Sequence, residues 1–369
     1  MYVRYLRKFD FVLFLTSLAL VAYGVILIYS GSLTNYKDVG LDLSHPVVRQ
    51  ILFALAGVAI MLAITYTDYH LLGYAASGLY VAALGALVLV LVVSSEVYGS
   101  RRWIEIAGTP VQPSEIAKLV LIIVLAKYLA DRQEQIGQLK TFLASLGIAL
   151  VPTALVFAEP DLGSAVIFVV IWVAMIIIAG ARSTHVLGLA SSFAIAMPFA
   201  LIGLINEYQR ERIATFLDPA KDPLGAGFNT LQAEIGIGSG GLFGKGLTQG
   251  TQTQLDYLRT QTTDYIFSVL GEELGFVGAV VLFALFVLLL LRGLQTAKSC
   301  PDPFGRLLAI GVVTFILFQV FINIGVNIRL LPVTGIPLPF ISQGGSSLIT
   351  LFIALGILQS IRVHQVSRW

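Results

Sequence analysis

The sequence has little charge, one cysteine and four histidines among its 369 residues. Asp, Glu, Lys and Arg make up 12% of the residues, whereas soluble proteins carry roughly a quarter. The net charge is only +2 and the chain has no basic cluster, so nucleic acid is not an expected partner. Cys300 alone cannot form an internal disulfide or a zinc site built on cysteine pairs, and the histidines are too scattered for a histidine-rich metal site.

Hydrophobic residues make up 57% of the sequence, and many of them gather in apolar runs of about 20 residues. A run of this length crosses the ~30 Å hydrocarbon core of a bilayer as a helix. Ten such runs predict an all-α, polytopic membrane protein with about ten transmembrane helices. Their approximate limits are residues 11–29, 47–66, 71–94, 114–130, 142–157, 162–180, 185–205, 265–291, 307–327 and 339–361.

The connections between these runs predict the orientation of the chain. The first run, 11–29, is longer than the apolar region of a signal peptide, so we interpret it as a retained anchor. An even number of spans puts both termini on one side, and the short connections of that side carry about twice as many Lys and Arg, which predicts cytoplasmic termini. The long segment 206–264 then faces outward from a single transmembrane domain, 1–369.

Polar residues on the outward side point to function, because charge within a bilayer is costly. The first group combines Arg102 with Glu115 and Lys118. Ser114 after Pro113 is expected to cap a helix, which would place Glu115 in the first turn and Lys118 one turn further on the same face. Either the two form an ion pair beside an interfacial arginine, or Arg102 and Lys118 line a polar cavity for an anionic head group.

The second group is Glu159-Pro160-Asp161, which lies in a tight turn between two closely spaced apolar runs. Asp161 is placed to cap the helix that follows. The alternative is that the turn forms a wall of the same cavity. The sequence leaves both interpretations open.

The long segment 206–264 contributes Arg210, Lys245 and a glycine-rich stretch, 238–246. Glycine lets backbone N–H groups come close to an anion, although the stretch lacks the terminal Lys-Ser/Thr of a Walker loop. Flexibility alone would also explain the glycines. The apolar residues of the segment predict that it packs on the bundle and is not disordered.

Three acids follow at the end of this segment. Asp264 stands at the start of the next apolar run, where it would either cap the helix or act as a general base in a partly buried environment. Glu272 and Glu273 lie about two turns into that run, where they need polar partners or water. We therefore expect all three acids to belong to the outward site.

The last group is the connection 323–347, which contains Ser342. Three prolines close together and a Gly-Gly pair break any helix here. Broken backbone at membrane depth is tolerated inside protein or beside a water-filled cavity. The connection is expected to form the floor of the cavity, with a purely structural bend as the alternative.

Together these stretches resemble the SEDS family (shape, elongation, division and sporulation), the polytopic peptidoglycan polymerases of bacteria. The resemblance covers nearly the whole chain. Thr67-Asp68-Tyr69 and the absence of extended tails are more similar to the RodA branch, which acts in elongation, than to the FtsW branch, which acts in division. The most specific stretches are Arg102-Trp103-Ile104, 112–118, 160–163, 238–246, 263–267 with Gly271-Glu272-Glu273, and 331–342.

This resemblance implies a glycosyltransferase of the cytoplasmic (inner) membrane that polymerises lipid II at its outer face during cell elongation. It also implies a class B penicillin-binding protein and the elongation machinery as partners, and Asp264 as the catalytic aspartate. As a base, Asp264 would deprotonate the acceptor hydroxyl while cations stabilise the leaving undecaprenyl pyrophosphate. No cofactor is assigned, although Asp264 could instead hold a divalent cation, Mg²⁺ or Mn²⁺.

The other site residues are inferred from their charge and their side of the membrane. Arg102, Lys118 and Arg210 are predicted to contact the pyrophosphate, and Glu115 to orient Lys118. The full set of predicted substrate-binding residues is Arg102, Glu115, Lys118, Asp161, Arg210, Lys245, Glu272, Glu273 and Ser342.

The chain departs from the SEDS pattern in three places. Arg259 lies in residues 258–262, where the family usually has a Pro-Glu-x-His-like stretch before the aspartate. Arg329 replaces an expected glycine, and Gln343 replaces an expected aromatic residue. The two extra cations could strengthen anion binding or alter the partner interface.

Two other functions stay open at this point, a lipid II flippase and a non-catalytic scaffold for the penicillin-binding protein. A flippase needs polar groups along the whole path, whereas the charges here concentrate on the outward half. A scaffold needs none of the buried acids. Both features favour the polymerase.

Overall fold

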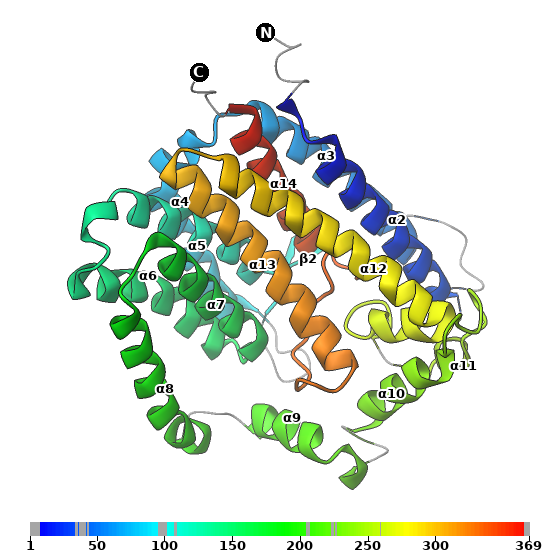
Figure 1. The fold of residues 1–369 in the computed structure, drawn as a ribbon. Helices are drawn as coiled ribbons and strands as arrows, with labels where there is room; N and C mark the ends of the chain where they lie inside the picture. Colours follow the sequence, from blue (N-terminus) through cyan, green and yellow to red (C-terminus); the bar gives the residue numbers. More distant parts are fainter. Residues whose placement is uncertain are drawn as a thin grey trace.

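The computed structural model describes residues 8–364 except 34–35, 37–41, 43, 95–101, 107–108, 204–206, 223–224, 226 and 259. The predicted fold class, an all-α polytopic membrane protein, is confirmed, and each predicted apolar run is helical along most of its length (Figure 1). The corresponding helices are α2 (Phe11–Ser32), α3 (Pro46–Tyr66), α4 (His70–Val93), α5 (Pro113–Ala130), α6 (Leu139–Ala158), α7 (Leu162–Ala179), α8 (Ser183–Gly203), α12 (Ile266–Ser299), α13 (Pro303–Asn327) and α14 (Gly345–His364).

Eight of these helices are long and apolar enough to cross a membrane, counted over the described residues. The other two are α5 and α8. Helix α5 carries the charged residues Glu115, Lys118 and Lys127, and the side chains of α8 are described only as far as Ile195. The chain is therefore a multi-pass membrane protein.

The long connection and the two chain ends lie at opposite ends of the bundle. Figure 1 shows the N and C labels together at one end, while the helices of segment 206–264 lie at the other. The prediction that this segment is ordered and packs on the bundle is confirmed, because its longest helix contacts α12. The elements of the segment are α9 (Glu207–Leu217), the 3-10 turn η2 (Pro219–Lys221), α10 (Phe228–Gly240) and α11 (Thr251–Gln254).

A short hairpin precedes α5. Strands β1 (Ile104–Ile106) and β2 (Thr109–Val111) pair antiparallel, with Ile104 opposite Val111. Beyond α5, the 3-10 turn η1 (Gln133–Gln135) leads into α6. Arg102 stands just before β1 and reaches the turn between α6 and α7, where it donates to the carbonyl of Pro160.

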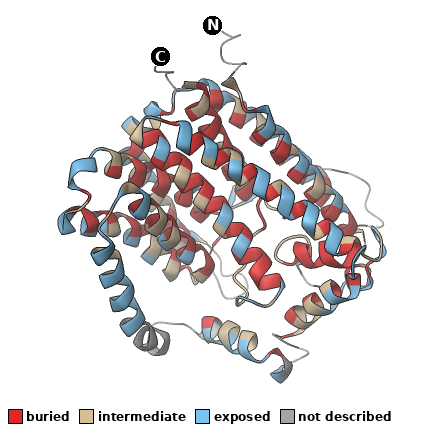
Figure 2. Cartoon of the chain, viewed as in Figure 1, coloured by how far each residue is buried: buried red, intermediate tan, exposed pale blue. Residues whose placement is uncertain are grey.

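The centre of the bundle is formed by α13 and α14, whose side chains are mostly buried (Figure 2). Helix α14 packs along α3, where a Cβ atom at Gly57 would lie 2.3 Å from the Phe352 ring and one at Gly356 would lie 3.0 Å from the Met61 carbonyl oxygen. Such small residues let membrane helices pack closely. Helices α4 and α8 expose most of their described side chains, as expected of helices that face lipid.

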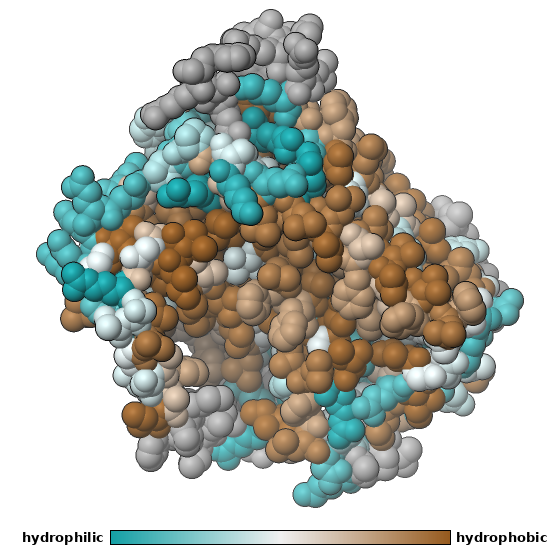
Figure 3. Space-filling view, viewed as in Figure 1, coloured by the Kyte–Doolittle hydropathy of each residue, from teal (hydrophilic) through white to brown (hydrophobic). Residues whose placement is uncertain are grey.

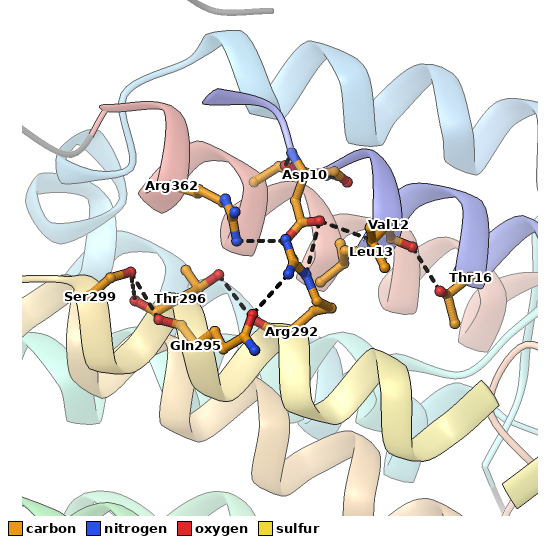
Figure 4. A network of polar contacts seen from close by, with 10 residues as sticks. Asp10, Val12, Leu13, Thr16, Arg292, Gln295, Thr296, Ser299 and Arg362 are labelled. Atoms are coloured by element: carbon orange, nitrogen blue, oxygen red, sulfur yellow. Dashed lines mark hydrogen bonds and ion pairs between the residues drawn. The ribbon is translucent and has the colours of Figure 1, made fainter. Parts of the chain in front are cut away.

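A carboxylate with two arginines holds the end of the bundle that carries the termini (Figure 4). Asp10 caps α2 by accepting the N–H of Leu13 at 3.1 Å. Its carboxylate also accepts hydrogen bonds from Arg292 of α12 at 2.9 and 3.1 Å and from Arg362 of α14 at 2.6 Å. Gln359 pairs with the Asp10 backbone in both directions. We call these four polar residues, Asp10, Gln359, Arg292 and Arg362, the Asp10 clasp.

Two helix starts differ from the prediction. Helix α5 begins at Pro113 with Gln112 as its N-cap, so Ser114 is not the cap. Proline suits the first helical position because the N–H that it lacks would have had no helical partner. Helix α12 begins after Tyr265, its N-cap residue, so Asp264 is not the helix cap.

Candidate active site

Asp264 lies in a tight turn, residues 260–265, directly before α12. Its N–H donates to the carbonyl of Thr260 at 3.1 Å, and Thr260 has a positive φ of 56°. Its own carbonyl oxygen accepts hydrogen bonds from the amides of Asn323 at 3.2 Å and Asn327 at 2.8 Å, both on α13. The backbone of Asp264 is thereby held in place without use of its carboxylate.

The two asparagines also join neighbouring elements at the 260–265 turn. Asn327 accepts hydrogen bonds from the N–H and the hydroxyl of Ser268 on α12, the latter at 2.7 Å. Asn323 donates to the carbonyl of Ile336 in the connection after α13 at 2.8 Å. Buried amides that use several of their groups make such a junction rigid. The sequence analysis did not single out these residues, although two amides four residues apart in an apolar run were a signal.

Ser342 and Gln343 hold the other side of the turn. The hydroxyl of Ser342 donates to the carbonyl of Thr263 at 2.6 Å and accepts the N–H of Leu338 at 2.8 Å. Gln343 donates its N–H to the carbonyl of Thr262 at 2.8 Å and accepts the threonine hydroxyl at 2.9 Å. Ser342, which we predicted to bind substrate, thus contacts backbone that positions Asp264.

The carboxylate of Asp264 faces Arg102 across Gly335. A Cβ atom at Gly335 would lie 3.3 Å from Nη1 of Arg102 and 4.0 Å from Oδ2 of Asp264. Gly335 has a φ of +75°, a backbone conformation in which a side chain is strained. The glycine therefore lets the cation and the carboxylate approach the same point, where a Cβ atom would already crowd the Arg102 guanidinium.

Arg102 is buried and joins the hairpin to the turn between α6 and α7. Its Nη2 donates to the carbonyl of Pro160 at 2.5 Å, and its Nη1 lies 3.6 Å from the carboxylate of Asp161. Asp161 caps α7 as predicted, accepting the N–H of Ser164 at 3.1 Å, and it also accepts the amide of Gln112 at 3.3 Å. These contacts bring together two groups of residues that are far apart in the sequence.

The electrostatic surroundings of Asp264 come from three residues that are distant in the sequence. Burial raises the pKa of Asp264, and Asp161 raises it further, whereas the positive charges of Arg212 and Arg102 lower it. Arg212, on α9, donates to the carbonyl of Val333 at 2.9 Å. Burial and the two arginines therefore have opposite effects on the pKa of Asp264, and the arginines act on it through their charge.

Arg212 on α9 lies in the field of Asp264, whereas Arg210, two residues earlier, is the residue predicted to contact the pyrophosphate. The side chain of Arg210 is exposed. Two residues along a helix point in nearly opposite directions, so only one of this pair can face the bundle. In a segment expected to be a loop, no helical period separates the two arginines; in the helix α9 it does. Arg212 also lines a small pocket of about 40 Å³ together with Pro160 and Val333.

Glu159 is a second buried acid beside this site. Its side chain is fully buried, and neither carboxyl oxygen has a hydrogen-bond partner. Burial raises the pKa of Glu159 to about 8, with a further contribution from Asp161, while Arg102 opposes the shift. At neutral pH the Glu159 carboxyl is therefore largely protonated, which lowers the cost of its burial.

Glu115 and Lys118 form the predicted ion pair, with Nζ of Lys118 2.7 Å from Oε1 of Glu115. Both side chains are fully buried. The second oxygen of Glu115 accepts the amide of Gln319 on α13 at 3.1 Å, and the ammonium group lies 5.3 Å from the centre of the Phe315 ring. Glu115 therefore orients Lys118 as expected. A charged pair at this depth is costly unless it has such partners.

Lys245, Glu272 and Glu273 form a separate group between the long segment and α12. Glu272 accepts the ammonium of Lys245 at 2.8 Å, and it also accepts hydrogen bonds from the backbone and the hydroxyl of Thr253. Glu273 accepts the hydroxyl of Ser30 on α2 at 2.6 Å. These predicted site residues thus attach the segment to the bundle, and within the described residues their hydrogen bonds and ion pairs do not involve the Asp264 turn.

The departures from the expected pattern have different structural settings. Arg329 has a φ of +55°, a conformation that favours glycine, and its guanidinium lies 3.4 Å from the carboxylate of Glu234. Gln343, as described above, bonds to Thr262. Arg259 lies outside the described residues. The positive φ explains why glycine is expected at position 329. The arginine found there forms an ion pair with Glu234.

The described residues contain no group of three or more His, Cys, Asp or Glu side chains that could hold a metal ion. Near Asp264 the neighbouring acid, Asp161, already caps a helix and lies against Arg102. A divalent cation prefers several oxygen ligands. The residues present therefore do not fit a cation held by the protein alone, and no step is derived through one.

The sequence matches the family described as cell cycle protein, FTSW_RODA_SPOVE, over residues 10–367. It is 40% identical to stage V sporulation protein E of Bacillus subtilis over 98% of both chains. It is also 38% identical to the peptidoglycan glycosyltransferase MrdB of Escherichia coli K12 over 96% of this chain and 94% of the relative, and 37% identical to the probable peptidoglycan glycosyltransferase FtsW of Geobacter metallireducens over 96% and 95%.

Two kinds of solved structure share the fold. One is a chain from a peptidoglycan synthase complex that coordinates polymerization and crosslinking, with a TM-score of 0.83 and 31% identity over 97% of this chain and 99% of that chain. The other is the rod shape determining protein RodA of Thermus thermophilus, with a TM-score of 0.71 and 30% identity over 97% of both chains.

Proposed function

The chain belongs to the FtsW, RodA and SpoVE family of cell cycle proteins and is a peptidoglycan glycosyltransferase of cell-wall synthesis, and on this basis we propose that it polymerises lipid II with Asp264 as the catalytic base. The observation that carries this proposal is the arrangement at Gly335, where a carboxylate that receives no hydrogen bond from the described residues lies near a buried arginine. The backbone of Asp264 is held by α13, so the carboxylate has a defined position before substrate binds.

The reaction transfers a glycosyl group between two lipid-linked sugars. Asp264 takes the proton of the acceptor hydroxyl as that oxygen bonds to the anomeric carbon of the donor sugar, and the bond from that carbon to the pyrophosphate breaks. A base works best when its pKa lies near the working pH, so burial favours Asp264 while Arg102 and Arg212 keep it ionised. The negative charge leaves on the undecaprenyl pyrophosphate.

Cations beside the base stabilise that leaving group. Arg102 is the best placed, because its Nη1 borders the space over Gly335. Arg212 is a second candidate because it acts on Asp264 from α9. Arg210 and Lys118 remain proposed pyrophosphate contacts, of which Lys118 is deeper and paired with Glu115.

The remaining predicted substrate-binding residues divide between two places. Asp161 belongs to the Asp264 site through Arg102. We propose that Ser342, Lys245, Glu272 and Glu273 act on substrate indirectly, because their contacts hold the protein's own backbone and side chains.

We further propose that the protein acts at the outer face of the cytoplasmic membrane, with both termini in the cytoplasm, during cell elongation. The position of the termini and of the Asp264 turn at opposite ends of the bundle supports this orientation. A class B penicillin-binding protein is the proposed partner, since a similar chain was solved in a peptidoglycan synthase complex. The similarity to MrdB and RodA supports the elongation role, while the sporulation and division relatives are equally similar in sequence.

The test is polymerisation by the purified protein reconstituted with its penicillin-binding partner and lipid II. We expect long glycan strands with the wild type and none with Asp264→Ala. Glu134→Gln, which changes an exposed acid in the turn η1, is the control and should polymerise like the wild type. Polymer from the Asp264→Ala variant at the wild-type rate would contradict the catalytic assignment. Absence of polymer from every variant, including the control, would contradict the activity itself.

A further inference from the structure

Helix α12 is interrupted at Gly275, and the long segment bridges the interruption. Gly275 has φ +64° and ψ −159°, which no helix contains. Residues 241–246 supply the missing hydrogen bonds. The carbonyls of Gly241 and Leu242 accept the N–H groups of Phe276 and Val277 at 3.0 Å, while the N–H groups of Lys245 and Gly246 donate to the carbonyls of Glu272 and Glu273 at 2.9 and 3.0 Å.

The bridge is a contact between two backbones with no room for side chains. A Cβ atom at Gly244 would lie 2.1 Å from the carbonyl oxygen of Glu273, and one at Gly275 would lie 2.3 Å from the nitrogen of Gly244. The glycines of this stretch, which we had considered for anion binding, thus allow close packing on α12. Because backbone hydrogen bonds at both halves hold it, the segment has a fixed height along the helix.

The position of the break relative to the membrane follows from charge. Between Glu273 and Arg292 the helix carries no charged residue. At a rise of 1.5 Å per residue this stretch covers about 27 Å, close to the thickness of the hydrocarbon core. The break therefore lies at the edge of the core, at the end of the bundle opposite the termini.

Three apolar side chains in or directly after residues 241–246 are exposed at this height. Phe243 is 79% exposed, Leu242 is 65% exposed and Leu247 is 43% exposed. On α12 itself, Phe276 next to the break is 62% exposed, so the apolar surface is continuous with the helix face that meets lipid. Figure 3 shows hydrophobic side chains in a broad band over α12, extending toward the end where it meets the long segment.

We propose that Leu242, Phe243 and Leu247, the interface wedge, insert into the membrane leaflet at the Asp264 end, and that this contact with lipid sets the height of the catalytic turn above the bilayer. Burial of three such side chains in lipid is favourable, whereas contact with water leaves them uncovered. The half of α12 held by the bridge begins two residues after Asp264. This second consequence rests on the proposed function, because only a lipid-linked substrate makes that height matter.

The first test measures membrane depth without reference to activity. Cys300, the sole cysteine, is replaced by serine and a nitroxide label is attached to Phe243→Cys in vesicles of phosphatidylethanolamine and phosphatidylglycerol. Two controls use the same background, Phe283→Cys on the exposed face of α12 and Glu134→Cys in an exposed turn. Power saturation then compares collisions with oxygen, which concentrates in lipid, and with a water-soluble nickel chelate.

We expect the label at 243 to resemble that at 283, with oxygen the more effective reagent, and to differ from that at 134. A label at 243 that nickel reaches as readily as at 134, or that neither reagent reaches, would overturn the proposal. The second outcome would mean that protein covers the wedge.

The second test examines the consequence for catalysis. We expect the double variant Leu242→Ser, Phe243→Ser to raise the KM for lipid II several-fold in vesicles with kcat unchanged, and to match the wild type in detergent micelles, where no bilayer sets a height. An unchanged KM in vesicles would refute the positioning role. Wild-type protein that makes no polymer while the label at 243 still contacts lipid would instead refute the proposed function and leave the wedge intact.

Discussion

The Asp10 clasp and the Asp264 turn contain the same kinds of groups at opposite ends of the bundle, a carboxylate near two arginines. In the clasp, Arg292 and Arg362 donate directly to the carboxylate of Asp10 at 2.6 to 3.1 Å. The clasp thereby ties α2, α12 and α14 together. Both arginines bind the carboxylate of Asp10, which therefore has a structural role.

At the Asp264 turn the hydrogen bonds go to the backbone instead. Asn323 and Asn327 bind the Asp264 carbonyl, and no residue of the described chain donates a hydrogen bond to its carboxylate. Arg102 and Arg212 act on that carboxylate from a distance while bonding to other carbonyls. The difference shows that a carboxylate whose backbone is fixed and whose side chain is left without donors is available for chemistry.

The largest effect is expected for Asp264→Asn. The asparagine keeps the size of the side chain but cannot accept the proton, so the polymerisation rate should fall by roughly 10²- to 10⁴-fold. Thermal stability should stay close to that of the wild type because no hydrogen bond to the carboxylate is lost. Rates with lipid II and melting curves on the same preparations check both expectations. A large fall in melting temperature would show that the carboxylate of Asp264 also has a structural role, as that of Asp10 does.

Asp10→Asn should show the opposite pattern. Removing one partner of a buried ion pair leaves the arginines uncompensated and costs about 3 kcal/mol of stability. We expect a lower midpoint of thermal unfolding but an unchanged rate per folded molecule, because the clasp lies at the far end of the bundle. A rate that falls as far as that of the Asp264 variant would show that the two ends are coupled.

Glu159→Gln should change stability with pH. The raised pKa of Glu159 means that burial disfavours its ionised form, so the wild type loses stability as the pH rises from the usual value near 4.5 toward about 8. The glutamine does not ionise, so the variant should gain stability relative to the wild type as the pH rises to 8, by about 1.4 kcal/mol for each unit by which the pKa is raised.

That difference in stability should vanish near pH 4.5. Melting temperatures measured from pH 5 to pH 9 test this, with Glu134→Gln as the exposed control. A constant offset between Glu159→Gln and the wild type at all pH values would contradict protonation of Glu159 in the folded state.

Arg212→Gln and Arg210→Gln compare two neighbours on α9. Because only Arg212 lies in the field of Asp264, we expect about a tenfold loss of polymerisation rate with Arg212→Gln, equivalent to about 1.4 kcal/mol. The loss with Arg210→Gln should be smaller. Equal losses, or a larger one at Arg210, would support Arg210 as the pyrophosphate contact.

The smallest effect is expected for Arg329→Gly, because Arg329 pairs with Glu234 and belongs neither to the clasp nor to the contacts of the Asp264 turn. Glycine relieves the strain of a positive φ, worth about 1 kcal/mol, but loses the exposed pair with Glu234, worth less. The variant should therefore melt at the same or a slightly higher temperature with its rate unchanged. Alanine at 329 serves as the control that loses the pair and keeps the strain, and it should melt lower than the glycine variant.

The helices could be predicted from the sequence because the length of an apolar run is a local property. The pair of Glu115 and Lys118 was equally local, since a spacing of three residues places both on one helix face. Arg212 could not be identified in this way, because the segment around it was not expected to be helical. Without knowledge that α9 is a helix, nothing distinguished it from Arg210.

The division of the predicted site into two groups was not accessible from the sequence. Glu272 lies eight residues after Asp264, yet it pairs with Lys245 and serves the bridge to the long segment. Whether an acid on α12 pairs with a lysine of the long segment or faces the substrate depends on where that segment packs against the helix. A single sequence carries no measure of that distance.

The amino-acid sequence by itself determined the solvent, the helices and the family of this protein, because hydropathy and motif spacing act over short stretches of chain. The tertiary structure alone decided which polar groups meet. Arg102 and Asp264 come together over Gly335 although they are far apart in the sequence, and Asp10 meets Arg362 from the other end of the chain. Such partners are set by helix packing, and that packing determines which carboxylate is neutralised by structure and which is left for catalysis.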